Sequence, residues 1–233
     1  MNYKKISGYV VLGILFFLPV TFLLFLYPAT HNYTPLEIVN ENVVELSSLD
    51  ELKLEGHITV LAFFGKKPLN KVISASNLKE LVYDKFKGFK KFQIIAVSPK
   101  SSKQEYVELD KEIKRYEELR FWHYAYSSEE DILKLYNSLK HKQPLDGDLS
   151  TDAVFIIDKD RSQRGRLDDR SDKEIEKDKP IYGLYSYNCV EVDEIKNKMN
   201  DDLRILFTEY RQKRKGNFNT DTRRANDLKE KAD

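Results

Sequence analysis

The chain has little cysteine, glycine and proline, and almost no net charge. A single cysteine, Cys189, occurs in 233 residues, so no intramolecular disulfide can form. A single cysteine is compatible with a reducing compartment, and equally with an oxidising one in which the fold needs no disulfide bonds. The formal net charge of +1 predicts no nucleic-acid partner. Nine glycines, seven prolines and 41% hydrophobic residues are typical of a globular domain with appendages.

An uncharged apolar run of 22 residues occupies Ile6–Tyr27. As a helix it would be about 33 Å long, enough to cross the core of a bilayer. Lys4 and Lys5 precede it, which predicts that residues 1–5 are cytoplasmic and that the rest is exported. A cleaved signal peptide is the alternative, but Tyr27 fits a small-x-small cleavage site poorly. We favour a retained single-pass anchor in the inner membrane, with the following domain in the periplasm, and the sequence leaves cleavage open.

Composition divides the exported part into three segments. Residues 28–40 look like a spacer, and residues 41–211 form the predicted domain. Residues 212–233 lack apolar periodicity and are expected to be a disordered basic tail. Residues 211–233 together hold eight lysines and arginines against four acidic residues. The remainder of the exported chain is mildly acidic.

Strand and helix patterns alternate within the predicted domain. Short apolar runs predict strands at residues 58–64, 92–97, 121–126 and 153–157, and residues 166–168 look like a fifth, antiparallel strand. Apolar residues at helical spacing predict helices at residues 69–86, 102–119, 127–139 and 190–211. Strands alternating with helices, followed by a hairpin and a last helix, predict an α/β, thioredoxin-like three-layer fold preceded by one transmembrane helix.

The loop after the first predicted strand reads Gly65-Lys66-Lys67-Pro68. In thioredoxin-like proteins this position carries cysteines, whose thiol pKa is lowered by the start of the next helix. No sulfur occurs here through Lys71, so neither dithiol exchange nor thiolate metal binding can occur in this loop. We interpret residues 65–68 as a degenerate active-site loop without a catalytic residue. The two lysines could attract an anion to a helix start, although an ordinary turn is the favoured interpretation.

Other candidate groups give weak signals. Cys189 precedes the last predicted helix and is a candidate reactive thiol, although a small buried hydrophobe is the favoured interpretation because no resolving cysteine exists. The four histidines show no local metal-binding spacing, and His123 is interpreted as a packed strand residue. The charged run 158–179 lacks the spacing of a calcium loop and is interpreted as a solvated, mobile hairpin loop. We therefore predict no metal site and no cofactor.

The chain resembles the SCO/SenC family of membrane-anchored, thioredoxin-like copper chaperones, and more closely their cysteine-free relatives in Bacteroidetes-type bacteria. Four features carry the resemblance over roughly residues 5–213. They are the N-terminal anchor, the strand VLAFFG at residues 60–65, the segment VFIIDKD at residues 154–160, and an ending that combines YGLY at residues 182–185 with DDLRIL and EYR at residues 201–211.

The copper site of that family uses two cysteines and a histidine, and this chain lacks all three. Residues 65–71 contain no cysteine, and residues 148–153 contain no histidine. The resemblance therefore implies a topology, a place outside the membrane and work in membrane-protein assembly, without copper.

We predict a non-catalytic binding or assembly module for membrane complexes, respiratory ones among them. It would be held by the Ile6–Tyr27 anchor and would contact a membrane-protein partner. The first alternative is a peroxidase or reductase that relies on Cys189 alone. The second is a structural membrane protein whose basic segment Arg211–Lys215 docks a partner. The sequence leaves the partner's identity and the oligomeric state open.

Overall fold

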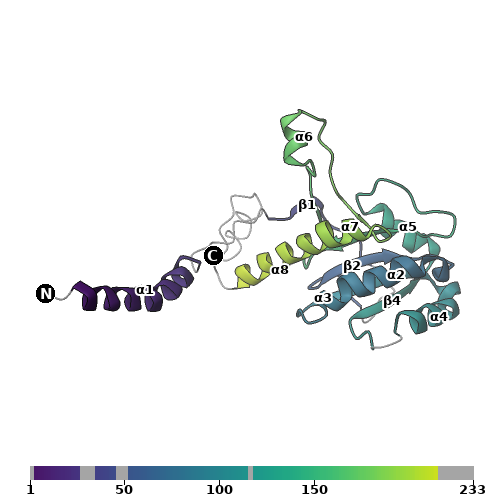
Figure 1. Ribbon diagram of the computed structural model, residues 1–233. Helices are drawn as coiled ribbons and strands as arrows, with labels where there is room; N and C mark the ends of the chain where they lie inside the picture. Colours follow the sequence, from purple (N-terminus) through teal and green to yellow (C-terminus); the bar gives the residue numbers. More distant parts are fainter. Residues whose placement is uncertain (1–2, 27–34, 46–51, 115–117, 215–233) are drawn as a thin grey trace, which may run out of the picture. The chain divides into compact units, whose positions relative to one another are not determined.

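The computed structural model describes residues 3–26, 35–45, 52–114 and 118–214 (Figure 1). The chain divides into two compact units, residues 1–34 and 35–233. The first unit contains helix α1 (Tyr3–Leu26), which has Pro19 inside it. Within the described residues, no helix is both long and apolar enough to cross a membrane. The transmembrane helix expected at residues 6–27 therefore stays a prediction.

The second unit alternates strands and helices along the chain. Its strands are β1 (Glu37–Asn40), β2 (Ile58–Phe63), β3 (Phe92–Pro99), β4 (Trp122–Ser127), β5 (Ala153–Ile157), β6 (Gln163–Gly165) and β7 (Tyr187–Asn188). Its α-helices are α2 (Val72–Leu78), α3 (Asp84–Phe86), α4 (Lys103–Ile113), α5 (Glu129–Asn137), α6 (Asp172–Glu176), α7 (Val192–Glu194) and α8 (Asn200–Arg214). Short 3₁₀ turns are η1 (Pro68–Lys71) and η3 (Lys100–Ser102), and π-helical turns are η2 (Lys79–Tyr83) and η4 (Ile195–Met199).

The strands form one mixed sheet in the order β1-β6-β5-β2-β3-β4, and β7 pairs with β5. Strands β2, β3 and β4 are parallel, whereas β5 runs antiparallel to β2 and β6 antiparallel to β5. A parallel βαβαβ unit followed by an antiparallel pair and a last helix is the strand arrangement of thioredoxin-like domains. The α/β prediction is confirmed.

Helices cover both faces of the sheet, and β2 and the residue after it have apolar side chains on both faces. Val60, Ala62 and Phe64 belong to one core with residues of α2, α4 and α8, while Leu61 and Phe63 belong to a second core with residues of α5. All six residues of β2 are buried. A strand with apolar side chains on both faces must lie inside a sheet with helices above and below it. This gives the three layers seen in the second unit (Figure 1).

Three boundaries differ from those expected. The strand after the 158–160 turn is β6, residues 163–165, rather than residues 166–168; Arg166 makes only an isolated bridge with Leu184. The expected spacer contains β1, which pairs with β6. Helix α8 continues to Arg214, three residues into the expected tail, and residues 215–233 lie outside the described part of the chain.

The run 158–179 is also more ordered than expected. Gln163, Arg164 and Gly165 are buried within it, and a capping box at Ser171 and Glu174 begins α6. Backbone pairing with β1 and β5 and a long-range ion pair at Arg164 explain the burial. The expectation of a solvated, mobile loop is therefore wrong for residues 163–165.

Candidate functional site

The degenerate loop follows β2 and lies against the segment that leads into β5. Gly65 has a φ of 70°, and a Cβ atom built on it would lie 2.3 Å from the backbone oxygen of Asp148. The Lys66 amide donates to that same oxygen at 2.7 Å. The Tyr106 hydroxyl donates to the Gly65 carbonyl at 3.1 Å. Glycine is therefore required at position 65 both by the backbone conformation and by the contact distance.

Each lysine of the loop region has a carboxylate partner. The Nζ–Oδ or Nζ–Oε distances are 2.7 Å for Lys66 with Glu129, 3.2 Å for Lys67 with Asp148, and 3.0 Å for Lys71 with Asp152. The three acids come from the start of α5 and from the segment before β5. These pairs are partly exposed, so each contributes little to stability. Their consequence is electrostatic: the positive charge that could draw an anion to Lys66 and Lys67 is compensated within the site.

The segment before β5 is held by Asp146. Its carboxylate accepts from the Ser150 amide at 2.7 Å, the Ser150 hydroxyl at 2.6 Å and the Asp148 amide at 3.0 Å. Burial alone would raise the pKa of Asp146, but these hydrogen bonds outweigh it and hold the pKa below its ordinary value. The arrangement fixes the backbone oxygen of Asp148 against Gly65.

This edge of the sheet offers charged groups and hydroxyls, but no thiol or imidazole in the described ranges named below. Lys67 is the most exposed of the three paired lysines, with 62% of its side chain accessible. Within residues 65–71, 127–131 and 146–152, all of which the structure describes, no cysteine or histidine occurs. The chemistry available to a partner is therefore a patterned set of positive and negative charges.

Cys189 follows β7 and is fully buried. Its amide donates to the Asp152 carbonyl at 2.8 Å, and its carbonyl accepts from the Asn77 side chain at 2.9 Å. Burial, with smaller contributions from the charges of Asp152 and Glu194, raises the pKa of the thiol well above its ordinary value. Such a thiol forms almost no thiolate at neutral pH, and thiolate is the reactive form.

No group of three or more histidine, cysteine or acidic side chains is placed to hold a metal in the parts of the chain that the structure describes. His123 is half-buried in β4, and its pKa is lowered first by burial and second by the charge of His57. No copper ligand set can be assembled from the residues of the degenerate loop.

Two buried ionic networks, which the sequence pattern did not reveal, connect the hairpin to α8. Arg164 is buried between Asp158, at 3.0 Å, and Glu209, and it also donates to the Leu36 carbonyl. Glu209 accepts a further bond from Lys213 at 2.6 Å. Arg164 lies 45 positions from Glu209 and 128 from Leu36 in sequence, so no local spacing could have indicated that they meet.

The second network is centred on Asp202 of α8. Arg166 donates to both carboxylate oxygens, at 2.9–3.1 Å, and the Tyr187 hydroxyl donates at 2.6 Å. Burial raises the pKa of Asp202, and it raises that of Tyr187 together with the neighbouring Asp202 charge. Both networks join structural elements that are distant in sequence.

No protein-family model matches the sequence, and no curated protein is a significant match. The chain is similar to solved structures of low sequence identity. A candidate electron transfer protein from Aquifex aeolicus VF5 is 15% identical, with a TM-score of 0.44, over 72% of this chain and 96% of that one. A yeast mitochondrial 1-Cys peroxiredoxin is 17% identical, with a TM-score of 0.40, over 75% of this chain and 79% of that one.

The thioredoxin domain of a thiol-disulfide oxidoreductase from Bacteroides vulgatus is 14% identical, with a TM-score of 0.37, over 64% of this chain and 99% of that one. At such similarity the fold class rests on the strand order and directions of the chain itself. Those are thioredoxin-like, and neither the comparisons nor the topology single out the SCO/SenC subgroup.

Proposed function

We propose that this protein is a non-catalytic, thioredoxin-like binding module of the SCO/SenC type. In this proposal residues 6–27 anchor it in the inner membrane. Its domain lies in the periplasm, where it supports the assembly of membrane complexes, respiratory ones among them. The observation that carries the proposal is the loop after β2, which has no cysteine, where Gly65 is held against Asp148 and Lys66 and Lys67 are paired with acids.

A loop of this kind favours binding over catalysis. A nucleophilic mechanism needs a thiolate or an activated hydroxyl next to a base, and the loop presents neither. A fixed pattern of charges on a rigid sheet edge suits recognition of a complementary protein surface, since such patterns steer and orient partners. The close contact at Gly65 and the Asp146 turn hold the pattern in one geometry.

The alternative, a peroxidase or reductase that uses Cys189 alone, requires that thiol to meet its substrate. Full burial and a raised thiol pKa both oppose this. The other alternative, docking through Arg211–Lys215, concerns a different part of the molecule. Its described residues 211–214 belong to the end of α8.

Site-specific photocross-linking in native cells tests the proposal. A benzophenone amino acid replaces Lys67 in one full-length variant and Lys134, an exposed lysine of α5 away from the loop, in a matched control. We expect the first variant to cross-link to subunits or assembly factors of a membrane complex, and the second to do so much less. Equal yields from both positions, or no membrane-protein product from Lys67, would contradict recognition by this edge.

A further inference from the structure

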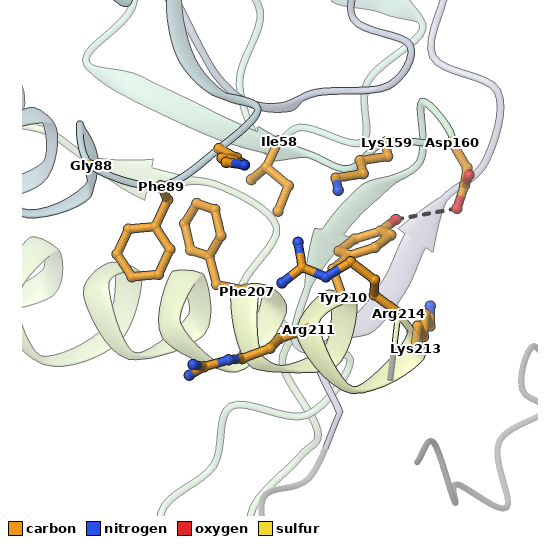
Figure 2. Close-up of a pocket in the computed structure, with 11 residues that line it drawn as sticks. Ile58, Gly88, Phe89, Lys159, Asp160, Phe207, Tyr210, Arg211, Lys213 and Arg214 are labelled. Carbon is orange, nitrogen blue, oxygen red and sulfur yellow. Dashed lines mark hydrogen bonds between the residues drawn. The ribbon is translucent and has the colours of Figure 1, made fainter. Parts of the chain in front are cut away.

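A pocket of about 710 Å³ lies beside Ile58, at the start of β2 (Figure 2). The degenerate loop follows the other end of that strand. We call this cavity the basic pocket. It is formed where β2 begins, by the loop before β3, by the turn between β5 and β6, and by the last turns of α8. Its walls are Ile58, Gly88, Phe89, Lys90, Lys159, Asp160, Phe207, Tyr210, Arg211, Lys213 and Arg214.

Positive charge dominates this pocket. Five of its residues are cationic and Asp160 alone is acidic. Asp160 accepts a hydrogen bond from the Tyr210 hydroxyl at 3.2 Å. Lys90, Lys159, Arg211 and Arg214 have no carboxylate within 4.0 Å among the described residues. This contrasts with the degenerate loop, where every lysine has an acidic partner.

Lys159 lies among the other cations of the pocket. Its ammonium group lies 4.7 Å from the centre of the Tyr210 ring, and the ammonium of Lys213 lies 4.8 Å from the same centre. Figure 2 shows Lys159 and Arg214 reaching into one space beside that ring. Burial lowers the pKa of Lys159, and the positive charges of Arg214, Lys91 and Lys213 lower it further. Cations held this close repel one another, which a bound anion would relieve.

The other half of the pocket is aromatic. The rings of Phe89 and Phe207 lie 4.3 Å apart, and Phe207 also stacks on the buried Phe86 at 5.5 Å. Phe89 is 45% exposed, so its ring is accessible on the surface. An aromatic surface beside a group of cations matches a ligand with an anionic end and a flat or apolar body.

We propose that the basic pocket binds a phosphate-bearing ligand. Lys159, Lys90 and Arg214 would hold the phosphate, and the adjoining apolar or aromatic part would pack on Phe89 and Phe207. Arginine and lysine are the usual phosphate partners, because the guanidinium group donates two parallel hydrogen bonds and the ammonium group acts as a point charge. A phosphate, as a monoester or a diester, offers more acceptor oxygens to several cations at once than a carboxylate does. The inference is independent of the function proposed for the degenerate loop.

The same chemistry is found in a soluble nucleotide and in a phospholipid headgroup. Calorimetric titration of the full-length protein in a neutral, non-ionic detergent separates the two sources. The probes are AMP, a short-chain phosphatidylglycerol below its micellar concentration, short-chain phosphatidylcholine and inorganic pyrophosphate. We expect AMP or phosphatidylglycerol to bind at least tenfold more tightly than pyrophosphate, which lacks an apolar part. Binding of AMP assigns a soluble ligand, and binding of phosphatidylglycerol but not phosphatidylcholine assigns an anionic headgroup.

Three variants assign the binding to this pocket. The double variant Lys159→Gln, Arg214→Gln should weaken binding of the preferred probe at least tenfold. Phe89→Ala should weaken that probe while leaving pyrophosphate unchanged. Lys134→Gln removes the same charge from α5 and should have no effect. Because the pocket cations repel one another, the double variant should keep or raise the thermal midpoint, so a loss of binding cannot be ascribed to unfolding. Failure of every probe to bind below about 1 mM, or equal binding by the double variant, would overturn the proposal.

Discussion

The backbone oxygen of Asp148 lies 2.3 Å from the position that a Cβ atom would occupy on Gly65. Two segments more than 80 residues apart therefore meet so closely that only a hydrogen atom fits between them. The contact closes the loop after β2 on the segment that contains Asp148, the acidic partner of Lys67.

Replacement of Gly65 by alanine should destabilise the protein by about 2–4 kcal/mol. A left-handed backbone costs an L-residue about 1–2 kcal/mol, and the clash with Asp148 adds an overpacking cost of similar size. Chemical denaturation of the full-length protein measures the change. Gly147→Ala, at a neighbouring position with open space and an ordinary φ, is the control and should change little. Equal stability of the two variants would show that the loop is not held as described.

Replacement of Arg164 by methionine should destabilise the protein by about 3–5 kcal/mol. Arg164 is buried with two carboxylates, those of Asp158 and Glu209, and its removal leaves buried charge without compensation. Arg204→Met, which breaks an exposed pair with Asp201, should cost less than about 1 kcal/mol. Adding Glu209→Gln to Arg164→Met should restore part of the stability. Strictly additive losses would contradict the proposed coupling between these two residues.

The protein should lose stability at alkaline pH. Burial is the main cause that raises the pKa values of Tyr106, Tyr124 and Tyr187 in the folded state above their ordinary value near 10. A raised folded-state pKa contributes stability that is fully present below pH 10 and is lost as pH rises above it, because the unfolded chain then releases protons that the folded chain retains. Lys159 has the opposite effect on stability as pH rises, because its folded-state pKa is lowered. It is a single group, so we expect the three tyrosines to dominate.

Thermal midpoints measured from pH 7 to pH 11 check this expectation. The midpoint should vary little between pH 7 and pH 9 and fall steeply above pH 10. The variant Tyr187→Phe should be less stable at every pH. Above pH 10 its unfolding should release up to one proton fewer, so its midpoint should fall less steeply with pH. A midpoint that stays constant through pH 11 would show that these hydroxyls are not buried.

Cys189 should be inert in the folded protein. Reaction with a disulfide reagent at pH 8 should be at least about 100-fold slower than in urea, because attack requires an opening that exposes the thiol. The variant Lys134→Cys, Cys189→Ser places the only thiol on an exposed position of α5 and should react at once. Rapid, stoichiometric labelling of Cys189 in the native protein would instead revive the thiol-dependent alternative.

Apolar pattern was enough to predict the central strands and the covering helices. Residues 58–63 and 153–157 have apolar side chains on both faces, and only a buried strand accommodates such a run. Strand β6, with the sequence QRG, carries no apolar signal, and its pairing with β1 and β5 is decided by the fold. For this reason the charged run 158–179 gave no sign of Arg164, which is one of the largest fully buried side chains among the described residues.

For the candidate sites too, some features could be predicted from the sequence and others depend on the fold. The absence of sulfur from residues 65–71 was evident from the sequence, and it limits the chemistry of the loop. The partners of Lys66 and Lys67 were not evident, because Glu129 and Asp148 approach only through the packing of α5 and of the segment before β5. The basic pocket brings together Phe89, Lys159 and Arg214, whose separation along the chain leaves no spacing rule to apply.

We expect this thioredoxin-like chain to work without thiol or copper chemistry. The most direct test isolates the full-length protein from the membranes of its native cells and measures bound copper by mass spectrometry, with peroxide consumption assayed on the same sample. We expect copper far below one ion per chain, and no peroxide consumption above that of Cys189→Ser. Copper near one ion per chain, or turnover that disappears in Cys189→Ser, would contradict this expectation.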